Sequence, residues 1–233
     1  MAKRPSQSQP HRSPAPIKDA MTMKETPPAP ERLIAERPAV ERPAAERIVE
    51  VARELFCRDG IHATGIDRIL STAGASKMTL YTRFGSKEAL VREVLLREGA
   101  EWRSAFFEAI ETRGDDPMEK LLQVVPALGK WFHSGRFYGC SFMNAAAEHS
   151  KGEPILREMA TQHHRCVLDF LETLTQAAGL HEPALVARQI LLTIDGTIAA
   201  LMVSGDPTVL TVAHRNLNSI LTQAKLSPNI SAN

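Results

Sequence analysis

The stretch GASKMTLYTRFGSKEAL, residues 74–90, decides how this chain is interpreted. Between residues 74 and 87 it carries three cations, Lys77, Arg83 and Lys87, with Tyr81 among them and no acid. The formal charge of the whole 233-residue chain is only +1, so this basic surface is a local feature. A local positive patch without acids is typical of a surface that meets a polyanion, and its alternative is an ordinary solvated face.

The residues before this stretch have the spacing of short amphipathic helices. A first helix is predicted from Glu46, because apolar residues recur at i, i+3, i+4, i+7 and i+8, and Gly60 is placed as its C-terminal cap. Thr64 is predicted to cap a second helix that Gly74 ends. The apolar positions of these two helices are Ile48, Val51, Ala52, Leu55 and Phe56, followed by Ile66, Ile69, Leu70 and Ala73.

The stretch itself predicts a third short helix, capped by Ser76 and running through Leu80 to Phe84, and a longer fourth helix capped by Ser86. Two short helices joined by a turn around Gly74, braced by the first helix, form a helix-turn-helix. In this motif the second helix of the pair lies in the major groove of DNA, with its N-terminal residues facing base edges.

Eight residues are therefore candidates for contact with double-stranded DNA. The N-terminus of the third helix offers a cation, an apolar side chain and hydroxyls to base edges, and the hydroxyls that follow it are within reach of phosphates. Helix N-termini at residues 64 and 86–87 offer backbone N–H groups to phosphates. The candidates are Thr64, Ser76, Lys77, Met78, Thr79, Tyr81, Thr82 and Lys87.

Residues 47–102 resemble the N-terminal domain of the TetR/AcrR family of transcriptional regulators. The resemblance rests on ARELFCRDGIHATGI and AGASKMTLYTRFGSKEAL, and it covers about a quarter of the chain. It implies that Thr64, Tyr81 and Lys87 contact the DNA backbone, and that Lys77, Met78, Thr79 and Thr82 face the groove. Thr82 stands where a larger His, Tyr or Lys is common in the family.

The resemblance also implies a cytoplasmic homodimer that binds a double-stranded DNA operator and is released from it, as a repressor, by a small-molecule inducer. The dimer is expected to form through two apolar helices, residues 156–178 and 184–204. A protein-binding helical adaptor is the first alternative. An enzyme is the second, although the chain has no GxSxG, HExxH or Gly-rich phosphate loop. No cofactor and no metal are expected.

The rest of the chain predicts more helices and no alternating strand pattern, so the expected fold class is all-α. Asp116 and Pro117 open one helix, Pro183 opens another that ends near Gly205, and Pro207 opens the last. The apolar helix near residue 190 is predicted to be buried rather than to span a membrane, because Arg188, Gln189 and Asp195 interrupt it.

Four segments follow from these patterns: a Pro-rich disordered tail at 1–43, a DNA-binding domain at 44–103, a helical ligand-binding and dimerisation domain at 104–226, and a short disordered tail at 227–233. Glu-Arg pairs recur every five residues from 31 to 46, a period that fits neither helix nor strand. They are read as a linker or, alternatively, as an arm that touches phosphates. The odd number of cysteines, three without CxxC spacing, favours a reducing cytosol.

Aromatic residues concentrate between 102 and 143, and a pocket for an apolar ligand is predicted among them. The predicted pocket residues are Trp102, Phe106, Trp131, Phe142, Met143 and His149. His163 and Cys166 share a helix face at i, i+3, a spacing able to hold a metal, but no third ligand is indicated. Packing or interface roles are therefore expected for them.

Overall fold

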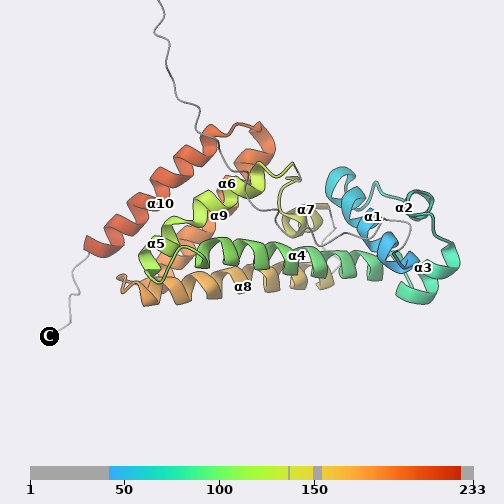
Figure 1. Ribbon diagram of the computed structural model, residues 1–233, viewed down its shortest axis with the longest axis horizontal. Helices are drawn as coiled ribbons and strands as arrows, with labels where there is room; N and C mark the ends of the chain where they lie inside the picture. Colours follow the sequence, from blue (N-terminus) through green and yellow to red (C-terminus); the bar gives the residue numbers. More distant parts are fainter. Residues whose placement is uncertain (1–41, 136, 149–153, 227–233) are drawn as a thin grey trace, which may run out of the picture. The chain divides into compact units, whose positions relative to one another are not determined.

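The computed structural model describes residues 42–135, 137–148 and 154–226. These residues form ten helices and no strand, which confirms the all-α prediction. Figure 1 shows them in chain order. Their bounds are α1 Ala44–Asp59, α2 Ile66–Ala73, α3 Lys77–Phe84, α4 Lys87–Glu111, α5 Pro117–Leu122, α6 Val124–Phe132, α7 Ser141–Glu148, α8 Pro154–Ala177, α9 Pro183–Ser204 and α10 Thr208–Leu226.

Local capping explains several of these boundaries. The Ser76 and Ser86 hydroxyls accept from the backbone N–H groups of residues 79 and 89, each at 3.1 Å. Asp116 caps α5 in the same way, at 2.9 Å from Met118 N. Gly60 and Gly74 stand at the C-terminal caps of α1 and α2, as predicted. Apart from Arg42 and Pro43, the predicted tails lie outside the described residues, as does His149.

Two clusters of buried apolar side chains hold the described helices together. The first joins α1, α2, α3, the beginning of α4, α7 and the start of α8, with Ile48, Ile69, Leu80 and Leu90 fully buried. The second joins the end of α4 to α5, α6, α8, α9 and α10. The helix α4 contributes to both clusters, so the domain boundary expected at 103/104 falls inside one continuous helix.

The helix α9 is long and apolar enough, by length and composition, to cross a membrane. One face of it packs into the second cluster through Val186, Ile190, Ile194 and Ile198. The prediction of a buried helix therefore holds for that face. The opposite face is exposed.

Candidate nucleic-acid interface and internal cavity

The helix α3 presents nearly all of its side chains to solvent. Leu80 is its one buried residue and anchors it to the first cluster. Met78 is 76% exposed and Tyr81 50% exposed, which is unusual for large apolar side chains. Lys77, Thr82 and Arg83 are exposed as well. A short helix with one anchor and five outward side chains is suited to insertion into a groove.

The turn before α3 is fixed by a cation from α1. The Arg47 guanidinium donates to the carbonyls of Ala73 and Gly74, each at 2.9 Å, and to Arg42 O at 2.8 Å. Two of these carbonyls lie at the C-terminal end of α2, where a helix leaves acceptors without intrahelical partners and favours positive charge. Arg47 thereby holds the turn that sets the direction of α3. No pattern in the sequence predicted this role.

The three cations of the acid-free stretch have different surroundings. Lys87 Nζ donates to Ile61 O at 2.7 Å and so joins the start of α4 to the α1–α2 turn. Lys77 Nζ pairs with Asp67 Oδ1 at 2.9 Å, and this hydrogen bond raises the pKa of Lys77. Arg83 has no hydrogen bond or ion pair with the described residues. Only part of the predicted positive patch is therefore free to meet a polyanion.

The predicted role of Thr64 is wrong as a cap. Gly65 occupies the N-cap of α2, and Thr64 is 0% exposed. Its hydroxyl donates towards Gly60 O at 2.7 Å and Leu55 O at 3.3 Å, so it closes the end of α1 instead. A buried hydroxyl occupied in this way has no path to a phosphate, and Thr64 leaves the candidate interface.

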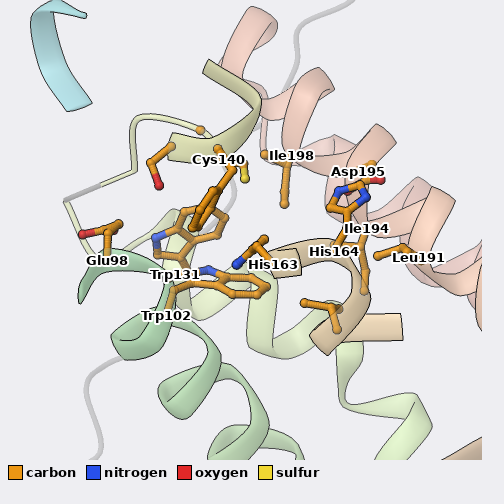
Figure 2. Close-up of a pocket in the computed structure, with 15 residues that line it drawn as sticks. Glu98, Trp102, Trp131, Cys140, His163, His164, Leu191, Ile194, Asp195 and Ile198 are labelled. Carbon is orange, nitrogen blue, oxygen red and sulfur yellow. The ribbon is translucent and has the colours of Figure 1, made fainter. Parts of the chain in front are cut away.

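A small cavity lies between α4, α6, α8, α9 and the segment that leads into α7 (Figure 2). Its volume is about 30 Å³, room for one or two water molecules. The walls are aromatic and branched aliphatic side chains: Trp102, Trp131, Phe142, Val167, Leu191, Ile194 and Ile198. The polar side chains are Glu98, His163, His164 and Asp195, with Cys140 and Ser141 beside them.

The two neighbouring histidines of the cavity have opposite environments. His163 is 93% buried, since 7% of it is exposed, and burial together with Arg103 lowers its pKa to about 4. His164 Nε2 lies 3.2 Å from Asp195 Oδ1, and that hydrogen bond raises the pKa of His164. Near neutral pH, His163 is the uncharged ring, whereas His164 forms a pair with a carboxylate.

The family comparison agrees with the geometry of α1 to α4. Residues 48–94 match the family model described as "Bacterial regulatory proteins, tetR family". Residues 48–94 therefore form a TetR-family domain.

Curated relatives of this chain are transcriptional regulators. The regulator YjdC of Escherichia coli K12 is 30% identical over 108 residues, which is 46% of this chain and 56% of YjdC. From Mycolicibacterium smegmatis, the repressor KstR2 is 34% identical over 37% of this chain and 42% of its own length. The activator FasR of the same organism is 33% identical over 42% and 45%. The match spans about half the length of these relatives or less.

Solved TetR-family structures match over most of the chain. SCO4454 of Streptomyces coelicolor has a TM-score of 0.72 and 25% identity, and the match covers 78% of this chain and 95% of SCO4454. A TetR regulator of Chloroflexus aurantiacus has a TM-score of 0.68 and 22% identity, with 77% and 94% covered. The fold of the C-terminal half is thus a TetR-family fold too. The relatives named here are regulators, not enzymes.

The structure brings three of the six predicted pocket residues to the cavity: Trp102, Trp131 and Phe142. Phe106 stacks on Trp102 with ring centroids 4.7 Å apart, but it is one turn further along α4 and buried in the second cluster. Met143 does not line the cavity, since it follows Phe142 on another face of α7. The spacing of residues along the sequence did not identify the polar side chains that line the cavity, because these side chains come from three separate helices, α4, α8 and α9.

The metal-ligating reading of the 163–166 segment finds no support in the described residues. They contain no group of three or more His, Cys, Asp or Glu side chains that could hold a metal. Instead, His163 and His164 line the cavity, while Cys166 does not.

The helix α7 reaches from the cavity to the helix-turn-helix. At its start, Phe142 lines the cavity and also packs in the first cluster. At its end, the Glu148 carboxylate accepts from His62 N at 2.9 Å, and Glu148 O accepts from His62 Nε2 at 2.9 Å. Gly60 permits this approach, because a Cβ there would lie 3.0 Å from the carboxylate. A shift of α7 would therefore change both the cavity wall at Phe142 and the contact between Glu148 and His62.

An uncovered apolar surface runs along α9 and onto α10. Leu185, Leu192, Gly196 and Val203 share the outward face of α9, and Val212 is exposed on α10. Leu192 is 72% and Val203 84% exposed. The outward face of α8 is polar, with Glu158, Thr161, Arg165, Asp169 and Thr173. Of the apolar residues of α8 that suggested a dimer helix, Leu171 and Leu174 are buried within the chain, and Leu168 and Phe170 are partly buried.

Proposed function

We propose that this protein is a DNA-binding transcriptional regulator that places α3 in the major groove of an operator. The observation that carries the proposal is α3 itself: it has one buried anchor, a capped N-terminus and exposed Lys77, Met78, Tyr81 and Arg83, with no acid in the helix. Such a helix offers donors and an apolar side chain to base edges and cations to phosphates. The match to the TetR model over residues 48–94 supports this reading.

The proposed contact residues are those predicted from the sequence, without Thr64. Ser76, Lys77, Met78, Thr79 and Thr82 face base edges or the groove, and Tyr81 contacts the backbone. Lys87 keeps a place beside the phosphates because an ammonium has three donors, one of which goes to Ile61 O. Arg83 joins the set as an exposed cation of α3, although the sequence predicted for it only a share of the local positive charge.

The test is selection of duplexes from a random pool, followed by fluorescence anisotropy with the enriched sequence at several salt concentrations. We expect a near-palindromic site with half-sites about one helical turn apart, on the order of 34–36 Å. The logarithm of affinity should fall linearly with the logarithm of salt concentration, because phosphate contacts release counterions. Arg83→Gln should reduce the magnitude of that slope by about one per half-site. A pool without enrichment, or binding that ignores salt, would favour the adaptor alternative instead.

The proposed regulator is a homodimer in the cytoplasm, joined through α9 and α10 rather than through α8 and α9. The support is the uncovered apolar face around Leu192, which a second copy would bury. Leu192→Asp should convert the dimer to a monomer in sedimentation experiments. Thr173→Asp, on the exposed polar face of α8, is the control and should leave the dimer intact. If Thr173→Asp dissociated the dimer and Leu192→Asp did not, the interface would instead lie on α8.

We propose, further, that a small molecule in the cavity releases the protein from its operator, which makes it a repressor. Support comes from α7, which contacts the cavity at Phe142 and the α1–α2 turn at Glu148. Named relatives include both a repressor and an activator. The direction is therefore decided by measurement: an effector that lowers operator affinity supports repression, and one that raises it supports activation.

A further inference from the structure

We infer that the cavity takes an uncharged, planar aromatic ligand with one hydrogen-bond acceptor, and that His163 donates to this acceptor. The inference rests on the proposed regulatory role of the cavity and adds the chemical class of its ligand. Three independent features carry it: the shape of the walls, the state of His163, and the charges around it.

The walls favour a flat aromatic ligand. The indole rings of Trp102 and Trp131 lie at 68° to each other with centroids 5.6 Å apart, and Figure 2 shows them beside His163. Phe142 stacks on His163 with centroids 4.2 Å apart. Flat rings on two sides of a cavity cover the faces of a planar ligand more completely than those of a bulky one. Because the cavity is only about 30 Å³, such a ligand must displace part of its wall.

His163 is a hydrogen-bond donor whose direction is fixed by a neighbour. Arg103 Nη1 lies 2.9 Å from His163 Nδ1, and a guanidinium only donates, so Nδ1 is the acceptor. Since the ring is neutral, its proton is on Nε2. Within the described residues nothing accepts from that N–H, although the side chain is 93% buried. No buried side-chain nitrogen or oxygen of the described residues lacks a partner, so this nitrogen is accessible from the cavity, where a ligand acceptor would bond it.

The charges around the cavity disfavour an anion. Neither lysine nor arginine is among the side chains that line it. Its two carboxylates are already paired, Glu98 with Arg53 and Asp195 with His164. A negatively charged ligand would meet two carboxylates and lose its hydration, and the nearest cation, Arg103, already donates to His163 Nδ1. A neutral ligand carries no charge to desolvate and is not repelled by the two carboxylates.

The test uses three probes of matched size: quinoline, which has one ring-nitrogen acceptor, naphthalene, which has none, and 2-naphthoate, which is an anion. Trp102 and Trp131 are the two tryptophans of the chain and both line the cavity, so intrinsic fluorescence reports occupancy directly. Near neutral pH we expect quinoline to bind about tenfold more tightly than naphthalene, the equivalent of one hydrogen bond, and 2-naphthoate not to bind.

Variants connect this preference to His163. His163→Phe keeps a ring against Phe142 but removes the N–H, and should abolish the advantage of quinoline over naphthalene. His163→Gln, whose amide can donate, should keep it, which also guards against a Phe variant that fails to fold. His133→Phe is the matched control, since His133 is exposed and bonds only within α6.

Three results would overturn the inference: tight binding of 2-naphthoate, an advantage of quinoline that survives in His163→Phe, or no fluorescence change with any probe. A parallel operator titration separates this inference from the proposed function. Operator binding without probe binding removes the ligand class alone. Probe binding by a protein that ignores DNA removes the regulator and leaves the cavity chemistry standing.

Discussion

The helix α3 and the internal cavity use similar residue types, but α3 exposes its binding side chains whereas the cavity encloses them. Side chains of α3 that would bind DNA are exposed, lie on one helix of eight residues, and depend on a single buried anchor, Leu80. Those of the cavity come from five parts of the chain, and His163 is almost wholly buried. A polyanion is met at the surface, whereas a small ligand must be enclosed. Changes on α3 should therefore alter affinity and spare stability, and changes at the cavity should alter both.

The largest effect is expected from a methyl group added beside the cavity. A Cβ at Gly99 would lie 2.7 Å from the Phe142 ring and 2.9 Å from Arg103 Nη1. Phe142 cannot retreat freely because it stacks on His163, so Gly99→Ala should lower stability by about 1–3 kcal/mol, measured by urea unfolding. Gly129→Ala in α6 is the control, with its nearest contact at 3.4 Å. Equal urea midpoints for the two variants would show that Phe142 and Arg103 can move away from residue 99 without loss of stability.

A smaller effect should separate two threonines of the helix-turn-helix. Thr64→Val removes a buried hydroxyl that donates to backbone carbonyls and should cost about 1–2 kcal/mol in thermal or urea unfolding. Thr82→Val on exposed α3 should change stability by less than about 0.5 kcal/mol, yet weaken operator binding. If Thr64→Val spared stability and weakened binding of any DNA, the phosphate role that the sequence suggested would return.

These two regions also differ in how far the sequence predicted them. The caps at Ser76, Ser86 and Asp116 were predicted because capping depends on residues two or three positions apart. Thr64 was misplaced because its hydroxyl turns back to α1, a choice made by the fold rather than by the adjoining helix. Arg47 was missed because its acceptors are 26 and 27 residues away in sequence.

The cavity shows the same limit more strongly. Aromatic content pointed to Trp102, Trp131 and Phe142, but it could not separate them from Phe106, whose place is decided by which way α4 faces. The pair of His164 and Asp195 depends on how α8 packs on α9, and no spacing along the chain contains that information.

A third prediction uses pH to test whether His163 is held neutral. The pKa of His163 falls from 6.5 to about 4 on folding. Between these pH values His163 is therefore protonated in the unfolded chain and unprotonated in the folded chain. The contribution of His163 to stability is thus fully present above pH 6.5 and is lost as pH falls towards 4. The loss is up to about 1.4 kcal/mol per pH unit.

Urea unfolding of the wild type and of His163→Phe across this range isolates the contribution of His163. The raised pKa of His164 acts in the opposite sense, adding stability below its unfolded value, but it is common to both proteins. The variant should lose less stability on acidification than the wild type does. Parallel pH profiles would show that His163 protonates without penalty, and would remove the basis for a fixed Nε2 donor.

The smallest effect concerns the surface of α3, where an acid shares the candidate interface. Asp67 pairs with Lys77 at 2.9 Å, and both side chains are largely exposed. Binding of Lys77 to DNA must break this pair, and the carboxylate itself would lie near phosphates. Asp67→Asn should therefore raise operator affinity about two- to fivefold at low salt, with the gain shrinking as salt screens the charge. Lys77→Gln should lower it, and the melting temperature should stay the same in both variants. Anisotropy titrations at two salt concentrations measure the changes. If Asp67→Asn leaves affinity unchanged while Lys77→Gln weakens it, Lys77 binds without leaving Asp67, and the pair acts as a fixed unit that orients the ammonium towards the groove.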